Sequence, residues 1–227
     1  MRHVYVLTAL MGVTGALSGC DLGAGDVTAT QSGASAVNGS ILVPAGLHSG
    51  TVATVNGSIH VNDNATVLAA TTVNGGIELG AHADAASLST VNGGVTVGEG
   101  THVAGAVTTV NGGMSLKSGA DVGGRVQNVN GGILLTNAHV GGGLQTVAGD
   151  IDVSGGSRVE GGIVVEKSGG WFNWRPRKPR IVIGPGAIVQ GDLRFERAVD
   201  LFVSDKATVG SISGATAIRF SGDHPPG

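Results

Sequence analysis

Apolar residues recur along this chain at intervals of six, a spacing that fits neither a helix nor a long strand. A second apolar residue often stands two positions earlier, as Ile59 does before Val61, with a polar residue between them. Two side chains that point the same way and are separated by one residue that points the other way indicate a short β-strand. The residues at the six-residue interval, which resumes after two steps of seven, are Val55, Val61, Val67, Val73, Leu79, Ala85, Val91, Val97, Val103, Val147, Val153, Val159 and Val165.

A longer repeat of 18 or 19 residues is superimposed on this interval. The tripeptide Val-Asn-Gly marks it, and Val147-Ala148-Gly149 continues the series. A fixed period of this length predicts a solenoid, here an all-β, single-stranded parallel β-helix with three short strands in each triangular coil. Nine or ten coils stacked ~4.8 Å apart would form a rod of about 45 Å. The asparagines of the repeat are Asn38, Asn56, Asn74, Asn92, Asn111 and Asn130.

These asparagines have two interpretations. Stacked coils would place them above one another, where their amides can hydrogen-bond along the rod as a structural ladder. Asparagine also tolerates the left-handed conformation that an Asn-Gly corner often requires. The alternative is a row of amides that binds sugars, which requires the ladder to face solvent.

Composition agrees with a thin, stacked core. The 227 residues include 42 glycines, 3% aromatic and 13% charged residues, with a net charge of −3. Disordered chains usually carry high net charge, so the low aromatic content here indicates close-packed β layers instead of disorder. The balance of charge also argues against nucleic acid as a partner.

The N-terminus has the features of a bacterial export signal. Arg2 and His3 precede an apolar run that is too short to span a membrane, which predicts a signal peptide over residues 1–19. Leu17-Ser18-Gly19-Cys20 resembles the lipobox of bacterial lipoproteins, and this resemblance implies lipidation of Cys20 and a membrane anchor in the cell envelope. Ordinary secretion with an incidental cysteine is the alternative. Residues 20–36 are predicted to form the lipidated cysteine and a flexible tether.

Two segments carry a family resemblance. VTVGEGTHVAGAV (95–107) and IVIGPGAIVQGDL (181–193) resemble the coil signature of bactofilins, bacterial polymer-forming proteins with a right-handed triangular β-helix. The resemblance extends in weaker form over residues 37–220, the predicted β-helix domain, and implies self-association. A lipobox and a long VNGG array are not typical of bactofilins. Left-handed hexapeptide-repeat acyltransferases share the six-residue interval, but the seven-residue steps favour the right hand.

One segment, residues 166–180, interrupts the repeat and is called the Trp/Arg insert below. Its two prolines are unfavourable in a central strand, so it either replaces one coil or loops out from the solenoid. Charge is also uneven: 2 basic and 9 acidic residues give −7 over 21–157, whereas 10 basic and 7 acidic residues give +3 from Arg158 onward. The candidate surface-binding residues in the insert are Trp171, Phe172, Trp174, Arg175, Arg177, Lys178 and Arg180.

Catalytic and metal chemistry have little support in the sequence. The histidines are scattered without a partner motif, and Asn62-Asp63-Asn64 lacks the repeated pattern of calcium-binding solenoids. Asp150 and Asp152 could share one strand face, as in β-helix lyases, but paired acids are usually just solvated. We therefore expect no enzyme activity, catalytic residue, metal or cofactor.

Two hypotheses remain: an envelope scaffold that self-associates through its solenoid ends, or a monomeric module whose insert contacts anionic lipid or cell-wall polymer. A C-terminal tail (221–227) follows the solenoid.

Overall fold

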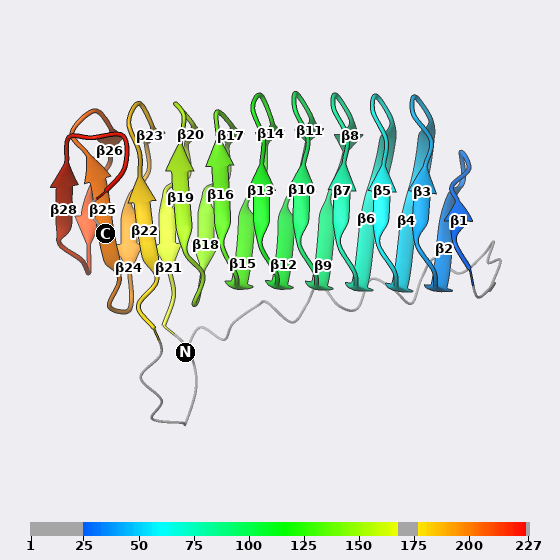
Figure 1. The fold of residues 1–227 in the computed structure, drawn as a ribbon, viewed down its shortest axis with the longest axis horizontal. Helices are drawn as coiled ribbons and strands as arrows, with labels where there is room; N and C mark the ends of the chain where they lie inside the picture. The colour runs from blue at the N-terminus through cyan, green and yellow to red at the C-terminus, as the bar shows by residue number, and fades with distance from the viewer. Residues whose placement is uncertain (1–24, 168–176, 226–227) are drawn as a thin grey trace.

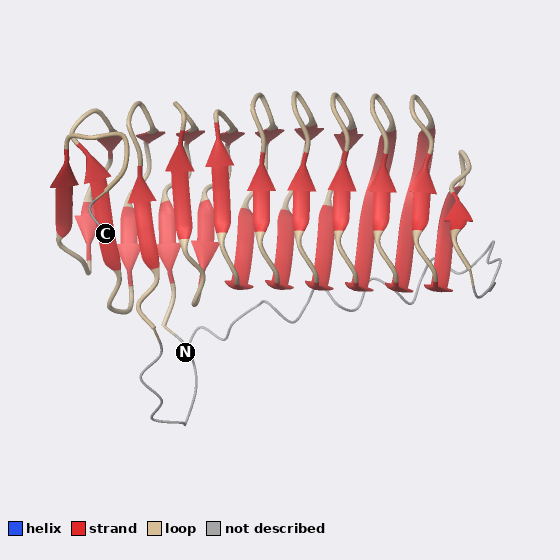
Figure 2. Cartoon of the chain, viewed as in Figure 1, coloured by secondary structure: helices blue, strands red, loops and turns tan. Residues whose placement is uncertain are grey.

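A computed structural model describes residues 25–167 and 177–225, and in these ranges the chain forms strands, turns and loops without any helix (Figure 2). The strands stack side by side into one long solenoid with three faces (Figure 1). The first face is an 11-stranded sheet made of β1 (Val27–Thr28), β3 (Ile41–Val43), β5 (Ile59–Val61), β7 (Ile77–Leu79), β10 (Val95–Val97), β13 (Met114–Leu116), β16 (Ile133–Thr136), β19 (Ile151–Ser154), β22 (Arg180–Ile183), β25 (Asp200–Ser204) and β28 (Ala217–Phe220).

The other two faces are joined into one 17-stranded sheet, because β4 and β6 bend around the corner between them. The second face contains β2 (Gly33–Asn38), β4 (His48–Asn56), β6 (Thr66–Asn74), β9 (Leu88–Asn92), β12 (Val107–Asn111), β15 (Val126–Asn130), β18 (Leu144–Thr146), β21 (Ile163–Val165), β24 (Leu193–Phe195) and β27 (Ile212–Ser213). The third face contains β8 (Asp84–Ala85), β11 (His102–Val103), β14 (Asp121–Val122), β17 (His139–Val140), β20 (Arg158–Val159), β23 (Ile188–Val189) and β26 (Thr208–Val209).

Every named strand pairs in parallel with the equivalent strand of a neighbouring coil. Asn56 pairs with Asn38 on one side and with Asn74 on the other, so residues 18 positions apart stand above one another. The predicted all-β solenoid with coils of about 18 residues is therefore confirmed.

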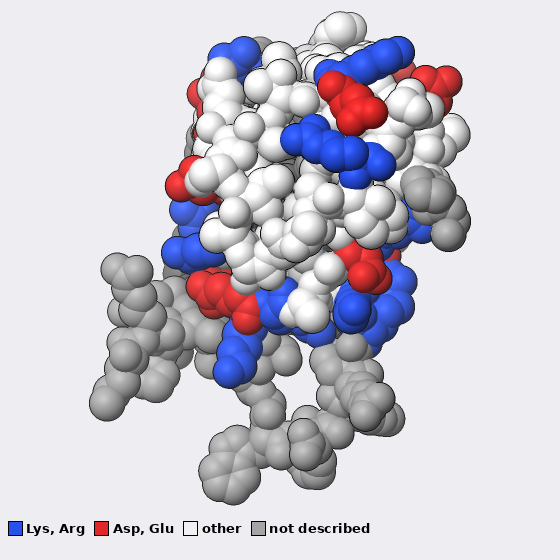
Figure 3. All heavy atoms as spheres, turned by 90° about the vertical axis from the view of Figure 1, so that its left-hand side faces the viewer, with Lys and Arg blue, Asp and Glu red and all other residues white. Residues whose placement is uncertain are grey.

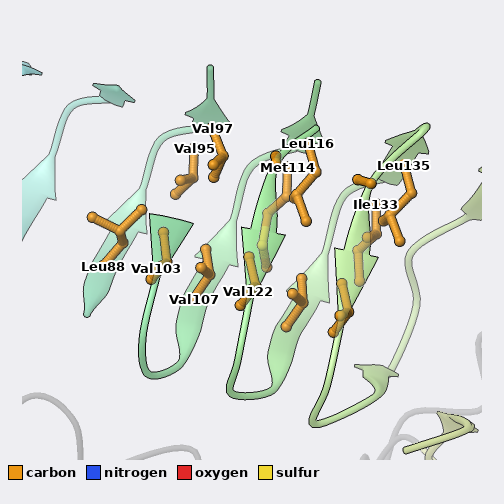
Figure 4. Packing of buried hydrophobic residues seen from close by; sticks show 14 of the residues in the cluster. Leu88, Val95, Val97, Val103, Val107, Met114, Leu116, Val122, Ile133 and Leu135 are labelled. Carbon is orange, nitrogen blue, oxygen red and sulfur yellow. The ribbon is translucent and has the colours of Figure 1, made fainter. Parts of the chain in front are cut away.

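The core is a narrow column of aliphatic side chains that point inward from all three faces (Figure 4). Val97, Val103 and Val107 are fully buried in one coil, one from each face. On the first and third faces the buried positions match the six-residue interval. On the second face most of them do not. Val55, Val73 and Val91 are only half-buried and point outward, next to the inward Thr54, Thr72 and Thr90, whereas Val165 is fully buried.

The buried threonines are held by hydrogen bonds to the preceding coil. Thr54, Thr72 and Thr90 donate to the carbonyls of Gly39, Gly57 and Gly75 at 2.9–3.0 Å. Thr109 and Asn128 make equivalent bonds in the next two coils. A hydroxyl can be buried at this position because the carbonyl satisfies it.

The first glycine of each VNGG corner allows the coils to approach closely. A Cβ atom on Gly75 would lie 1.9 Å from the carbonyl oxygen of Gly57, and one on Gly93 would lie 2.0 Å from that of Gly75. No side chain fits such a space, so this corner requires glycine.

One predicted boundary differs from the structure. The solenoid begins at Val27 rather than at residue 37, since β1 pairs with β3 and β2 pairs with β4. Residues 27–36 were therefore wrongly assigned to the tether: their small side chains fit the thin core, where Ala29 and Ala36 are buried. The Trp/Arg insert does not replace a coil, because β19 pairs directly with β22. Val153 is opposite Ile183, 30 positions later (183 − 153), and the insert lies in the chain between β21 and the start of β22.

Candidate functional site

The six asparagines of the repeat form a continuous ladder on the surface. Each amide nitrogen donates to the amide oxygen of the preceding asparagine, from Asn56 onto Asn38 through to Asn130 onto Asn111, at 2.8–3.0 Å. All six side chains are exposed. Each amide uses one of its two hydrogens along the ladder, so another hydrogen and acceptor lone pairs face solvent. This arrangement fits the interpretation of the asparagines as a structural ladder. The ladder also faces solvent, which the sugar-binding alternative requires.

A groove of about 680 Å³ crosses the first face from β10 to β22. Its walls include the hydroxyls of Thr96 and Ser115 and the apolar side chain of Leu134. At its C-terminal end the tail residues His224 and Pro225 fold back over the sheet, and Val182 is only 8% exposed although it points outward. The groove combines apolar surface with a few polar groups, as ligand sites usually do.

Acidic groups gather at the closed end of this groove. Asp150 and Asp152 both line it, as does Arg180. Burial raises the pKa of the Asp152 carboxyl, and the nearby Ser154, His224 and Arg180 only partly oppose this rise. One oxygen of Asp152 is buried without a hydrogen-bond partner. Asp150 is engaged elsewhere: it accepts from the Arg180 backbone amide at 2.8 Å and pairs with the Arg177 guanidinium.

The described part of the Trp/Arg insert is bound to the solenoid through its basic residues. Arg177 pairs with Asp150, Lys178 lies 3.8 Å from an Asp200 carboxylate oxygen, and the Arg180 guanidinium lies 4.9 Å from the centre of the Phe202 ring. Arg177 and Lys178 remain largely exposed despite these contacts. Four predicted members of the surface, Trp171, Phe172, Trp174 and Arg175, lie outside the described residues.

A row of alternating acids and histidines follows the third face. His102 and His139 each direct Nδ1 at a carboxylate oxygen of Asp121, at 3.0 and 2.5 Å, and Nε2 of His139 lies 3.4 Å from Glu160. The hydrogen bond from His139 and a weaker one from His102 hold the pKa of Asp121 below its usual value. Among the residues that the structure describes, no set of three or more His, Cys, Asp or Glu side chains could hold a metal ion. The carboxylate of Asp63 accepts from the Ala81 amide at 2.8 Å, which is a structural role.

The C-terminal end of the solenoid is left open by the described residues. Val209 and Ile212 of the last coil are only partly buried, although the equivalent Val189 and Leu193 of the previous coil are fully buried. Figure 3 looks onto this end and shows mostly uncharged surface, with charged groups of both signs among and around it.

The groove and the hydrogen bonds of the buried threonines were not anticipated from the sequence, although the Thr-X-Asn-Gly spacing is a visible signal for the threonine bonds.

Comparison with known proteins found no matching family model, no matching curated protein and no matching solved structure. Cys20 and the signal segment precede the described residues. In residues 25–167 and 177–225 no helix has the length and apolarity needed to cross a membrane.

Proposed function

We propose that this protein is a lipid-anchored structural element of a bacterial cell envelope that associates with further copies through its C-terminal coil. The uncapped last coil carries this proposal. Inward-facing Val209 and Ile212 remain partly exposed there, and the backbone groups of β26 and β27 on the outer side pair with no described strand. An open strand edge with apolar side chains favours pairing with another chain.

The membrane anchor in this proposal rests on the lipobox that ends in Cys20. Acyl chains on this residue would place the N-terminal end of the rod at the membrane. The open coil is at the other end of the rod (Figure 1), where it would be free to meet a second copy.

The contacts of the Trp/Arg insert support this function over the alternative of an adhesive module. Arg177 and Arg180 are already engaged by Asp150 and Phe202 of the solenoid, as expected for a segment that covers a corner. A basic residue that serves to bind an anionic surface would gain nothing from an internal acidic partner such as the one that Arg177 has in Asp150.

Sedimentation of the full-length chain in detergent tests the association. Wild type is expected to form larger species as its concentration rises, and Ile212→Lys should suppress them because a charge at the open end cannot be buried in a contact. Leu68→Lys is the matched control, since Leu68 is 62% exposed on the side of the rod. Self-association that persists in Ile212→Lys, or is lost equally in Leu68→Lys, would contradict the proposal. Circular dichroism checks that both variants remain folded.

A further inference from the structure

The six Val-Asn-Gly tripeptides of the repeat share a chemical reactivity. In an Asn-Gly pair the backbone nitrogen of the glycine can attack the side-chain carbonyl carbon of the asparagine, and glycine has no side chain to obstruct the approach. Each of the six asparagines has the same neighbours in sequence, so any difference in their reactivity must come from the fold. The tripeptides end at Gly39, Gly57, Gly75, Gly93, Gly112 and Gly131.

In five of the six tripeptides, the next coil holds the glycine amide. The N–H of Gly112 donates to the backbone carbonyl of Asn130 at 2.9 Å. The four earlier glycines make the equivalent bond at 2.9–3.0 Å. A nitrogen engaged in this way must leave its hydrogen bond, by local opening of the coil, before it can react.

The Gly131 amide lacks this protection. Within the described residues its N–H donates to no acceptor. The reason is the strand register: β12 and β15 pair through their asparagines, whereas the pairing of β15 with β18 ends at Gln127 opposite Gln145. The nearby Asn128 does not replace the missing bond, since its side-chain nitrogen donates to Gly112 and its side-chain oxygen has no partner.

The Asn130 side chain is also the last of the ladder. The side-chain oxygens of the five earlier asparagines each accept from the asparagine of the next coil. The Asn130 oxygen accepts from no described group, because Ala148 follows Val147 where the next asparagine would stand. The Asn130 side chain is therefore held by one bond only, the one that it donates to Asn111.

We propose that Asn130 is a site of spontaneous deamidation, and that the stacked coils protect the other five asparagines of the ladder. The Gly131 nitrogen bonds to Cγ of Asn130, and the side-chain amide leaves with the Gly131 proton as ammonia, so that a succinimide ring forms. Water then opens the ring at either of its two carbonyls, which gives aspartate or isoaspartate. Both products place a negative charge at the end of the ladder, and isoaspartate adds one carbon to the backbone where Gly131 stacks closely on Gly112.

Peptide mapping by mass spectrometry tests the proposal on the full-length chain, incubated in detergent at mildly alkaline pH. Trypsin places Asn130 in the peptide 126–158 and the other five asparagines in the peptide that ends at Lys117. Asn130 is expected to deamidate about tenfold faster or more than any of the others, because those react only after two hydrogen bonds break. The same incubation in urea is the matched control, and there all six should react at similar rates.

Asn130→Ala separates the two sources of protection. It makes Asn111 the last asparagine of the ladder, but the Gly112 amide keeps its bond to the backbone carbonyl at position 130. Asn111 should therefore stay slow in this variant, and circular dichroism checks that the variant is folded. The proposal is overturned if Asn130 reacts no faster than the other five in the folded chain, or if its lead persists in urea. Deamidation of Asn111 in the variant as fast as that of Asn130 in wild type would refute the role of the Gly131 amide.

Discussion

Thr72 places a hydroxyl group inside an aliphatic core, where it donates to the Gly57 carbonyl at 2.9 Å. Thr72→Val keeps the shape of the side chain but removes this donor. We expect the free energy of unfolding, measured by chemical denaturation, to fall by about 1 kcal/mol. Thr71→Val is the matched control, since the neighbouring side chain points outward and is half-exposed, and it should change stability by less than ~0.5 kcal/mol. Equal effects from the two substitutions would show that the buried bond contributes nothing.

Asp152 makes stability depend on pH in a defined direction. Burial raises its pKa in the folded chain, so the folded state holds a proton that the unfolded state has released. Stability is therefore lost as pH rises from the unfolded value of ~3.9 through the folded pKa. Asp152→Asn cannot titrate, and its stability relative to wild type should increase between about pH 3 and pH 7. Thermal melts across this range measure the difference.

Asp84→Asn is the control for that experiment, because Asp84 is exposed on the third face. It should show a smaller change relative to wild type over the same range. A stability difference between Asp152→Asn and wild type that stays constant with pH would contradict the assigned direction.

The asparagine ladder acts at the scale of the strands it connects. Asn92 donates to Asn74 and accepts from Asn111, whereas Asn38 at the start of the ladder makes one such bond, with Asn56. Exposed bonds of this kind contribute about 0.5 kcal/mol each, so Asn92→Ala should cost about 1 kcal/mol and Asn38→Ala about half as much. Chemical denaturation of the two variants measures both values. If Asn38→Ala is as costly as Asn92→Ala, the ladder bonds are not the cause.

The hydrophobic pattern predicted the strands better than it predicted their inward faces. On the first face, inward residues such as Ile59 and Val61 are apolar, so the alternation is visible in the sequence. On the second face, the inward position of Thr54 is polar and the outward Val55 is apolar, which reverses the signal. The reversal is possible because the Gly39 carbonyl satisfies the buried hydroxyl, and this partner lies 15 residues away in the chain.

At the scale of the whole molecule, the sequence predicted what the repeat determines and missed what distant segments create together. The groove depends on the tail residues His224 and Pro225 folding back beside Asp152, more than 70 positions earlier (224 − 152 = 72). No local pattern encodes that contact. The first coil was missed for another reason: Val27-Thr28 and the small residues that follow are typical of a linker by composition. They form strands because the next coil offers them a partner.

The constant register of the coils has a consequence for how such a molecule changes over time. Because residues 18 positions apart occupy equivalent places, loss or duplication of one whole repeat would rejoin the three faces without a mismatch. Each such event would shorten or lengthen the rod by about 4.8 Å and leave its two ends as they were. The length of the rod is therefore set by the number of repeats in the sequence. Recombination that adds or removes a repeat would change the distance between the two ends of the rod, and it would require no new kind of contact inside the fold.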